Sequence, residues 1–257
     1  MATGVRKSGE FCWINILTSR PAEAREFFSN LFGWTYTDLP EMGGGIIKAD
    51  GHDIGGLWDL DAQSTPPGTP PGIGVMVKVD NADDAAAKVK SLGGKAQPPM
   101  DIMTNGRMVA CTDPTGAAFD LWEAKDQPGT DADTRQHGVP SWSELLTDDP
   151  ERARKFYTTM FGWTANERDM GPIGKYTELK LGEDYVAGMM QITPEMGDMP
   201  TGWSTYVTVN DVDETAEKAS GLGGNIFMPV MDVPTVGRMA GISSPQGVVF
   251  YVIKYAQ

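Results

Sequence analysis

The chain contains nearly the same stretch of sequence twice, and this repeat constrains the fold more than any other feature. Residues 11–35 and 140–164 agree at 11 of 25 positions with a constant offset of 129. Each copy carries a tryptophan at its third position, Trp13 in the first and Trp142 in the second. Identity at this level over one fixed offset indicates a duplicated unit, so the fold has to be assembled from repeated parts.

Each copy of the repeat predicts a strand, a helix and then further strands. The apolar run 11–17 is typical of a strand, and Thr18 or Ser19 can cap a helix over 21–32. That helix has a proline in its first turn and ends before a glycine, as helices commonly do. Short runs bounded by turn residues predict three more strands, at 34–37, 45–49 and 53–59.

The same order starts again after a proline-rich connector at 64–72. A strand at 73–79 leads to Asp80 or Asn81, either of which can cap a helix that ends near Leu92. Turn residues then separate three more predicted strands, at 95–100, 107–112 and 117–123. Because the residues from 140 onward repeat this pattern, we predict four strand–helix–three-strand units in two pairs.

The four units predict an α+β fold with two domains joined by a polar linker that contains proline and glycine. The first domain covers residues 1–125 and the second covers residues 138–257. The units within them span about 11–60, 73–123, 140–191 and 203–254.

Composition excludes several classes of partner. The net charge of −14 gives an acidic surface, which disfavours binding to nucleic acid and to anionic membranes. The first ten residues lack the apolar core of a signal peptide, and Cys12 and Cys111 have no metal-like spacing. We therefore expect a cytoplasmic protein without disulfides, a monomer or homodimer whose partner is a small-molecule ligand.

Three pairs of motifs resemble one known family. They are the helix ends FFSNLFGW and FYTTMFGW, the segments VKVDNADDAAAKVKSLGG and VTVNDVDETAEKASGLGG, and the turns with their strands DPTGAAFDLWE and SPQGVVFYVIK. In these motifs each half resembles the vicinal oxygen chelate superfamily of glyoxalases, bleomycin-resistance proteins and extradiol dioxygenases. The resemblance implies that two βαβββ units pair in each half and that their curled mixed sheet forms a cup.

Metal-dependent members of that family hold a metal ion in the cup, with ligands from the first and last strand of each unit. Counting from the shared motifs places these positions on Trp13, the stretch from Gly56 to Trp58, Gly74 and Asp120, and in the second half on Trp142, about Gly188, Ser204 and Tyr251. Of these residues only Asp120 can bind a metal tightly, and one carboxylate does not make a metal site. The resemblance thus implies no metal and no other cofactor, and each tryptophan stands where a relative holds its first ligand.

Strand alternation indicates which other side chains face the cups. Asn15 shares a face with Trp13, and Glu144 shares one with Trp142. Candidate ligand-binding residues are Trp13, Asn15, Trp58, Trp122, Trp142, Ser204, Met108 and Met239. Candidate acid–base residues are Glu144, Asp120 and Tyr251. The alternative interpretations are that the tryptophans are core, that Glu144 belongs to a buried hydrogen-bond network, and that Arg107 or Lys125 pairs with Asp120.

Three functions remain open at this point. The first is a metal-independent protein of the sequestration or resistance type, which binds a small, largely apolar or aromatic molecule in one or two cups. The second is a metal-independent lyase, isomerase or ring-opening enzyme. The third, a metal-dependent glyoxalase I or dioxygenase, is disfavoured by the missing ligands. The units can pair within each half or crosswise, and crosswise pairing would bring Asp120 and Glu144 into one cup.

Overall fold

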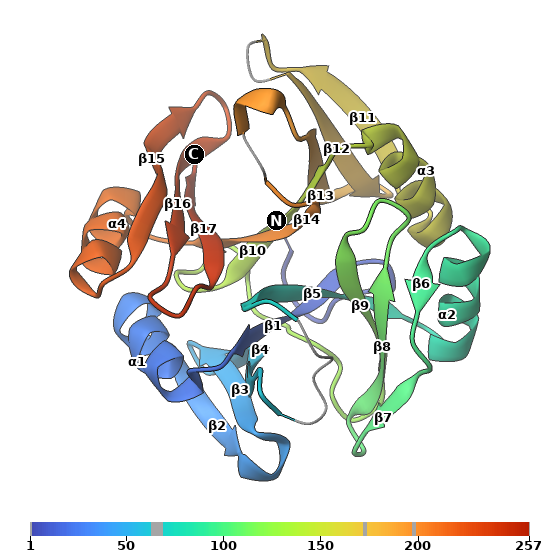
Figure 1. The fold of residues 1–257 in the computed structure, drawn as a ribbon, viewed down its shortest axis with the longest axis horizontal. Coiled ribbons are helices and arrows are strands. Elements are labelled where there is room, and N and C mark those ends of the chain that lie inside the picture. Colours follow the sequence, from blue (N-terminus) through green and yellow to red (C-terminus); the bar gives the residue numbers. More distant parts are fainter. Residues whose placement is uncertain (1, 63–68, 172–173, 197–198, 257) are drawn as a thin grey trace.

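The chain folds into four units, each of which begins with a strand and a helix (Figure 1). The structure is a computed structural model, and it describes residues 2–62, 69–171, 174–196 and 199–256. Residues 64–68 of the predicted connector lie outside the described residues. The first half comprises β1 (Phe11–Thr18), α1 (Pro21–Phe32), β2 (Thr35–Leu39), a 3-10 turn (Pro40–Met42), β3 (Gly44–Ala49), β4 (His52–Asp59), β5 (Gly72–Val79), α2 (Ala82–Ser91), β6 (Lys95–Ala96), β7 (Met100–Ile102), β8 (Gly106–Thr112) and β9 (Ala118–Ala124).

The second half repeats this order with small differences in length. It comprises β10 (Pro140–Thr147), α3 (Pro150–Phe161), β11 (Thr164–Asp169), β12 (Lys175–Leu181), β13 (Asp184–Gln191), a 3-10 turn (Pro194–Met196), β14 (Gly202–Thr208), α4 (Val212–Gly221), β15 (Asn225–Val233), β16 (Gly237–Ser243) and β17 (Val249–Tyr255).

The predicted strands and helices agree with these bounds apart from two details. The N-cap of α1 is Arg20, which makes no side-chain cap, so the prediction of Thr18 or Ser19 was wrong. Asn81 does cap α2, because its side chain accepts a hydrogen bond from the Asp84 backbone N–H. The single strand predicted at 95–100 is instead divided into β6 and β7, since two consecutive prolines between them cannot donate to a ladder.

Each half forms its own mixed sheet, which decides between the two pairings that the sequence left open. In the first sheet the strand order is β2-β3-β4-β1-β5-β9-β8-β6, with β7 beside β8, and in the second it is β11-β12-β13-β10-β14-β17-β16-β15. The first strands of two consecutive units, β1 and β5, run antiparallel at the centre of their sheet, and β10 and β14 do the same in theirs. Crosswise pairing of the sheets is therefore wrong, and Asp120 and Glu144 lie in different sheets.

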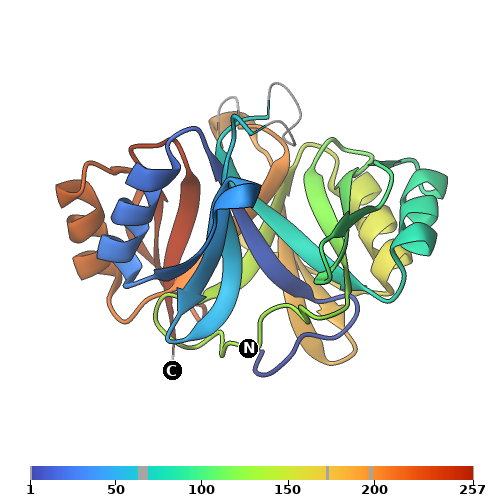
Figure 2. The ribbon, with the colours of Figure 1, turned by 90° about the horizontal axis from the view of Figure 1, so that it is seen from below.

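The helices nevertheless connect the two halves crosswise. Figures 1 and 2 show α1 beside α4 on one flank of the molecule and α2 beside α3 on the other. One buried cluster joins Phe28 of α1 to Phe250 of β17, with ring centroids 5.5 Å apart. The other cluster joins Phe119 of β9 to Tyr157 of α3, with centroids 5.8 Å apart. Each hydrophobic core is thus completed by side chains from both halves.

Two tryptophan hydrogen bonds reinforce this connection between the halves. Trp34 Nε1 donates to the carbonyl of Gly138 at 2.7 Å, and Trp163 Nε1 donates to the carbonyl of Gly9 at 2.8 Å. Both rings are almost completely buried. In the described part of the chain, no helix has both the length and the apolar character needed to cross a membrane.

Candidate functional site

The face of each sheet opposite its helices carries a cluster of aromatic, methionine and polar side chains, and we call this face its cup. Along β1 the buried side chains of Ile14 and Ile16 belong to the helix-side core, and Asn15 and Leu17 alternate with them and are only partly buried. An irregularity between Phe11 and Trp13 places the buried Cys12 beside Trp13, in the cluster on the opposite face. The N-terminal cup is lined by Trp13, Asn15, Trp58, Met76, Met108, Asp120 and Trp122. The C-terminal cup is lined by Trp142, Glu144, Tyr176, Ser204, Tyr206, Met239 and Tyr251.

Strand register shows which residues lie at the same level across each cup. Asn15 is opposite Gly56 of β4 on one side and Gly74 of β5 on the other. In the second half Glu144 occupies the equivalent level, opposite Gly188 and Ser204. Asn15 and Glu144 therefore lie opposite the predicted ligand positions on the two neighbouring strands. Asp120 and Tyr251 register instead with Met76 and Tyr206, which pair with Trp13 and Trp142.

The residues at this level do not fit the metal site of metal-dependent relatives. A side chain at Gly56 would have its Cβ 2.5 Å from the indole ring of Trp58, and a Cβ at Gly188 would coincide with the Tyr176 hydroxyl. Aromatic groups thus fill the space from which a ligand on either strand would point inward. Within the described ranges, no three His, Cys, Asp or Glu side chains are grouped closely enough to hold a metal ion.

A short hydrogen-bond chain crosses the N-terminal cup. Trp58 Nε1 donates to Asn15 Oδ1 at 2.9 Å, which leaves the Asn15 amide nitrogen to donate to the carboxylate of Asp120. The two cations considered for Asp120 pair elsewhere, because Arg107 binds Asp83 and Lys125 binds Asp101. Burial without a cationic partner raises the pKa of Asp120 to about 7, although the hydrogen bond from Asn15 opposes the shift.

The C-terminal cup contains a denser hydrogen-bond network centred on Glu144. Trp142 Nε1 donates to the Tyr176 hydroxyl at 3.1 Å, and this hydroxyl in turn donates to Glu144. Tyr206 donates its hydroxyl to Glu144 Oε1 at 3.0 Å, and its ring stacks on Tyr251 with centroids 4.6 Å apart. The carboxylate therefore receives two hydroxyl groups, which supports the buried-network interpretation of Glu144.

Burial raises the pKa values of the Glu144 carboxyl and of the tyrosine hydroxyls around it. The pKa of Glu144 is raised, mainly because burial disfavours its charged form, while the hydroxyls of Tyr206 and Tyr176 counteract the shift. The same burial, together with the nearby Glu144, raises the pKa of Tyr251 to about 12. Both tyrosines that contact Glu144 also have raised pKa values, so they act as neutral hydrogen-bond donors.

Comparison with known proteins places these cups in a family. The model of the Glyoxalase/Bleomycin resistance protein/Dioxygenase superfamily matches residues 11–121 and 140–252. The chain belongs to this superfamily.

Among curated members of the superfamily, "Putative glyoxylase CFP32" of Mycobacterium tuberculosis is 36% identical over 249 residues, which cover 95% of this chain and 94% of that protein. "Anthracycline biosynthesis protein DauV" of Streptomyces sp. (strain C5) is 29% identical over 262 residues, covering 96% of this chain and 93% of the relative. Both relatives share nearly the full length of the chain.

Solved structures of the superfamily show the same fold at low sequence identity. The Mn(II)-bound glyoxalase from Novosphingobium aromaticivorans has a TM-score of 0.67 at 15% identity, covering 98% of this chain and 82% of that one. The 2,3-dioxygenase LapB from Pseudomonas sp. KL28 has a TM-score of 0.66 at 16% identity, covering 100% and 96%. At such identities the likeness establishes the fold alone.

The two arginines that recur in the GRM motifs lie outside the superfamily cups. Arg107 pairs with Asp83 of α2, and Arg238 pairs with Asp213 of α4 at 2.7 Å and with Asp232 of β15 at 2.8 Å. Each arginine thus fastens a helix to the end of its sheet.

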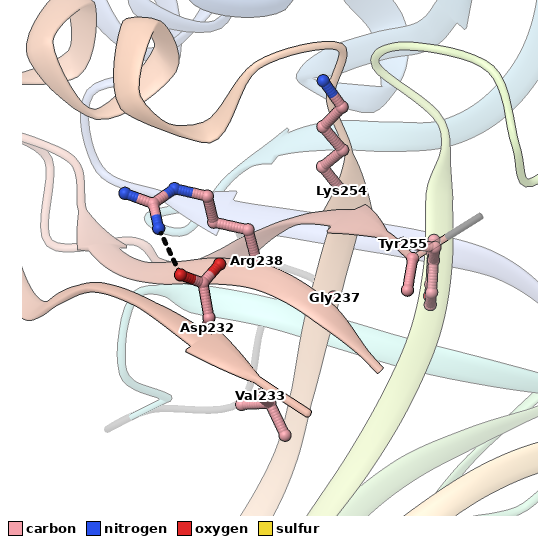
Figure 3. A pocket seen from close by; sticks show the side chains of 7 residues that line it. Asp232, Val233, Gly237, Arg238, Lys254 and Tyr255 are labelled. Atoms are coloured by element: carbon pink, nitrogen blue, oxygen red, sulfur yellow. Dashed lines mark hydrogen bonds and ion pairs between the residues drawn. The ribbon is translucent and has the colours of Figure 1, made fainter. Parts of the chain in front are cut away.

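Figure 3 shows Arg238 and Asp232 at an open hollow of about 490 Å³ that is lined by Asp232, Val233, Gly237, Arg238, Lys254, Tyr255 and Ala256.

The structure places all the candidate residues on the cup faces but divides them between two separate cups. Glu144, Ser204 and Tyr251 share one cup, and Asp120 lies in the other beside Asn15. Trp122 is only 6% exposed and donates to the carbonyl of Gln127, which is the behaviour of a core residue.

Sequence reasoning missed two tyrosines that contact Glu144. Tyr206 was within reach of that reasoning, because it lies two residues after Ser204 on the same strand and so shares its face. Tyr176 comes from β12, and no local signal in the sequence sets the register that brings its hydroxyl over Gly188.

Proposed function

We propose that the protein binds a small, largely apolar or aromatic molecule in one or both cups, without a metal ion at the cups. The observation that carries this proposal is the lining of each cup. A partly exposed tryptophan, Trp13 or Trp142, lies next to a few polar groups and to glycines whose space is filled by aromatic groups. Such a surface suits stacking against a flat molecule whose few polar atoms are hydrogen-bonded.

The relatives support this class of ligand. DauV is named for the biosynthesis of anthracyclines, which are fused-ring aromatic compounds, and it matches this chain over almost its full length. The net charge of −14 adds a preference for neutral or cationic ligands over anions. A role in sequestering or carrying such a molecule needs no reactive group.

A second candidate function is metal-independent acid–base catalysis on a carbonyl compound. The observation that favours it is Asp120, a cup-facing carboxyl whose pKa of about 7 suits proton transfer near neutral pH. Glu144 and Tyr251 are less suited to that role, because Glu144 already accepts two hydroxyls and the Tyr251 hydroxyl keeps its proton up to high pH.

Calorimetric titration with product analysis tests both functions. We expect hydroxyanthraquinones to bind and methylglyoxal to be left unconverted, and elemental analysis after dialysis should find far less than one metal ion per chain. Replacement of the cup tryptophan that contacts the ligand, Trp13→Ala or Trp142→Ala, should weaken binding several-fold. Failure of all aromatic probes to bind, or one tightly held metal ion per chain, would contradict the proposal.

A further inference from the structure

The two cups differ in how open their polar groups are. In the N-terminal cup Asn15 and Asp120 are both partly exposed. In the C-terminal cup Glu144 is 8% exposed and Tyr206 is 6% exposed. The polar groups of the first cup thus retain some exposed surface, whereas the carboxyl of the second is buried.

Strand β5 provides room beside the polar groups of the N-terminal cup. Gly72 and Gly74 alternate with Met76 on its inner face, so two successive cup-facing positions carry no side chain. A Cβ added at Gly74 would be in ordinary van der Waals contact with Asn15 and Asp120, at 3.7–3.9 Å, and one added at Gly72 would meet nothing within 4 Å. The equivalent of Gly74 in the other cup is Ser204, which faces Glu144.

The hydrogen-bond chain of the N-terminal cup ends at the Asp120 carboxyl, which can form further hydrogen bonds. Asn15 has used its oxygen on Trp58 and its nitrogen on Asp120, but Asp120 has no cation and no hydroxyl donor among the described contacts. Its Oδ2 lies 3.9 Å from the position of a Gly74 Cβ, so a ligand atom in the place of that Cβ would lie next to the carboxyl, and the position over Gly72 beside it is open. A carboxyl can receive up to four hydrogen bonds when ionised and can donate one when protonated.

From this geometry we propose that the N-terminal cup holds the ligand, with a neutral hydroxyl or carbonyl group over Gly74, hydrogen-bonded to Asp120, and the planar part toward Trp13 and Trp58. This inference rests on the proposed function and narrows it to one site and one ligand chemistry. The C-terminal cup, whose carboxylate is occupied by Tyr176 and Tyr206, then serves as a structural counterpart.

The chemistry of Asp120 selects neutral polar groups. With a pKa near 7, the carboxyl exists in both forms at neutral pH, so it can accept from a phenol or donate to a quinone carbonyl. A ligand carboxylate or phosphate would meet the ionised form at close range and be repelled. We therefore expect a ring compound with a hydroxyl or carbonyl at its edge to bind better than the same ring bearing a carboxylate.

One glycine substitution in each cup tests the choice of cup. Gly74→Val fills the proposed ligand space, and Gly202→Val adds the same side chain to the inner face of β14, two residues before Ser204, where an added Cβ would meet nothing within 4 Å. With 1,2-dihydroxyanthraquinone as the probe in calorimetric titration, Gly74→Val should weaken binding at least ten-fold and Gly202→Val less than two-fold. Thermal unfolding of both variants checks that they are folded, and Gly74→Ala provides a milder step if Gly74→Val is not.

The polar contact has its own test in the same titration. Asp120→Leu should weaken binding of the dihydroxy compound at least five-fold but should change binding of anthracene, which has the same three rings and no hydroxyl or carbonyl group, much less. An equal loss of affinity for both compounds would show that the ligand makes no hydrogen bond to Asp120 and would overturn that part of the inference.

The outcomes separate this inference from the proposed function. Loss of binding in Gly202→Val with none in Gly74→Val would place the ligand in the other cup and overturn the inference alone. Binding that neither variant alters would overturn the inference and show a site outside the glycine faces of both cups. A wild-type protein that binds none of the aromatic probes would contradict the proposed function, and the inference with it.

Discussion

The N-terminal and C-terminal cups are built from the same repeated sequence, yet they use their central carboxyl groups differently. Glu144 is buried and accepts hydrogen bonds from two tyrosine hydroxyls, and one of these tyrosines, Tyr206, stacks on Tyr251. Asp120 has one amide donor from Asn15, retains some exposed surface and lies next to Gly74. Two copies of one fold thus keep the same strand arrangement, while the central carboxyl is buried in one copy and stays partly exposed in the other.

The two halves also share their hydrophobic cores. Each sheet is made by one half, but each helix-covered core is shared, with α1 against α4 and α2 against α3. The backbone ladders therefore define two cups, whereas burial of apolar surface joins them into one body. This arrangement decides what happens when the cups are separated, altered or titrated.

Separating the cups should have the largest effect. We expect residues 138–257, expressed alone, to give no monomer with a cooperative unfolding transition, because the isolated half exposes Phe156, Tyr157 and Phe250. Co-expression with residues 1–125 should restore a stable complex. Size-exclusion chromatography with light scattering and thermal unfolding measure this. A monomeric second half that unfolds cooperatively would show that the shared cores are dispensable.

Removing each carboxyl in turn should have the next largest effect. Glu144→Ala should lower the free energy of unfolding by about 3–5 kcal/mol, since it leaves a cavity and two hydroxyls without their acceptor. Asp120→Ala should change it by no more than about 1 kcal/mol at pH 8, because the lost contact with the Asn15 amide is offset by removal of a buried charge. Urea denaturation provides both values. Equal losses at the two positions would contradict the contrast between a closed and an open cup.

Ionisation of Asp120 should make the free energy of unfolding depend on pH, with an effect smaller than the two above. Its pKa is about 7 in the folded protein and near 3.8 in the absence of burial, so the folded state binds more protons between these values. The free energy of unfolding should accordingly fall as the pH rises from about 4 to 7 and level off above. Glu144 contributes in the same direction because its pKa is also raised.

Asp120→Asn should isolate the contribution of Asp120. Complete linkage over this range amounts to roughly 4 kcal/mol, and partial exposure of the carboxyl should reduce it to about 2 kcal/mol. The variant should then be more stable than wild type at pH 8 by about 2 kcal/mol and similar to it near pH 4. Denaturation across this pH range, with Glu144→Gln as the control for the other cup, makes the measurement. A variant with the wild-type pH slope would show that Asp120 titrates normally.

The smallest expected effect concerns the tryptophan donors of the two networks. Trp58→Phe removes the hydrogen bond to Asn15, and Trp142→Phe removes the one to Tyr176. We expect each to cost about 0.5–1.5 kcal/mol, with the larger value for Trp142, whose partner belongs to the closed network. Thermal unfolding at pH 7 compares them. A clearly larger loss for Trp58→Phe would reverse the contrast between the cups.

Much of the fold could be predicted because its determinants are local. Helix ends, turns and the offset of 129 identified four units, and strand alternation placed Trp13 and Asn15 on an inner face. The pairing of the units could not be predicted, because the linker permits either arrangement. The structure combines features of both arrangements: the strands pair within each half, and the apolar cores are formed by side chains from both halves.

The candidate site was predictable only in part for a similar reason. Counting along the sequence put the tryptophans at the first ligand position. Strand register divides the predicted positions between two levels, that of Trp13 and Trp142 and that of Asn15 and Glu144. Tyr176 reaches Glu144 through a strand whose position depends on tertiary pairing. That Asp120 lacks a cation followed from the structure, since sequence alone offered Arg107 and Lys125 as partners and both pair elsewhere.

A crystal structure of the protein with 1,2-dihydroxyanthraquinone tests the central claim most directly. We expect one molecule per chain in the N-terminal cup, with an oxygen over Gly74 within hydrogen-bond distance of Asp120 and no metal ion between ligand and protein. The C-terminal cup should retain the contacts of Glu144 with Tyr176 and Tyr206. A ligand seated against Glu144, or one bound through a metal ion in either cup, would contradict the account.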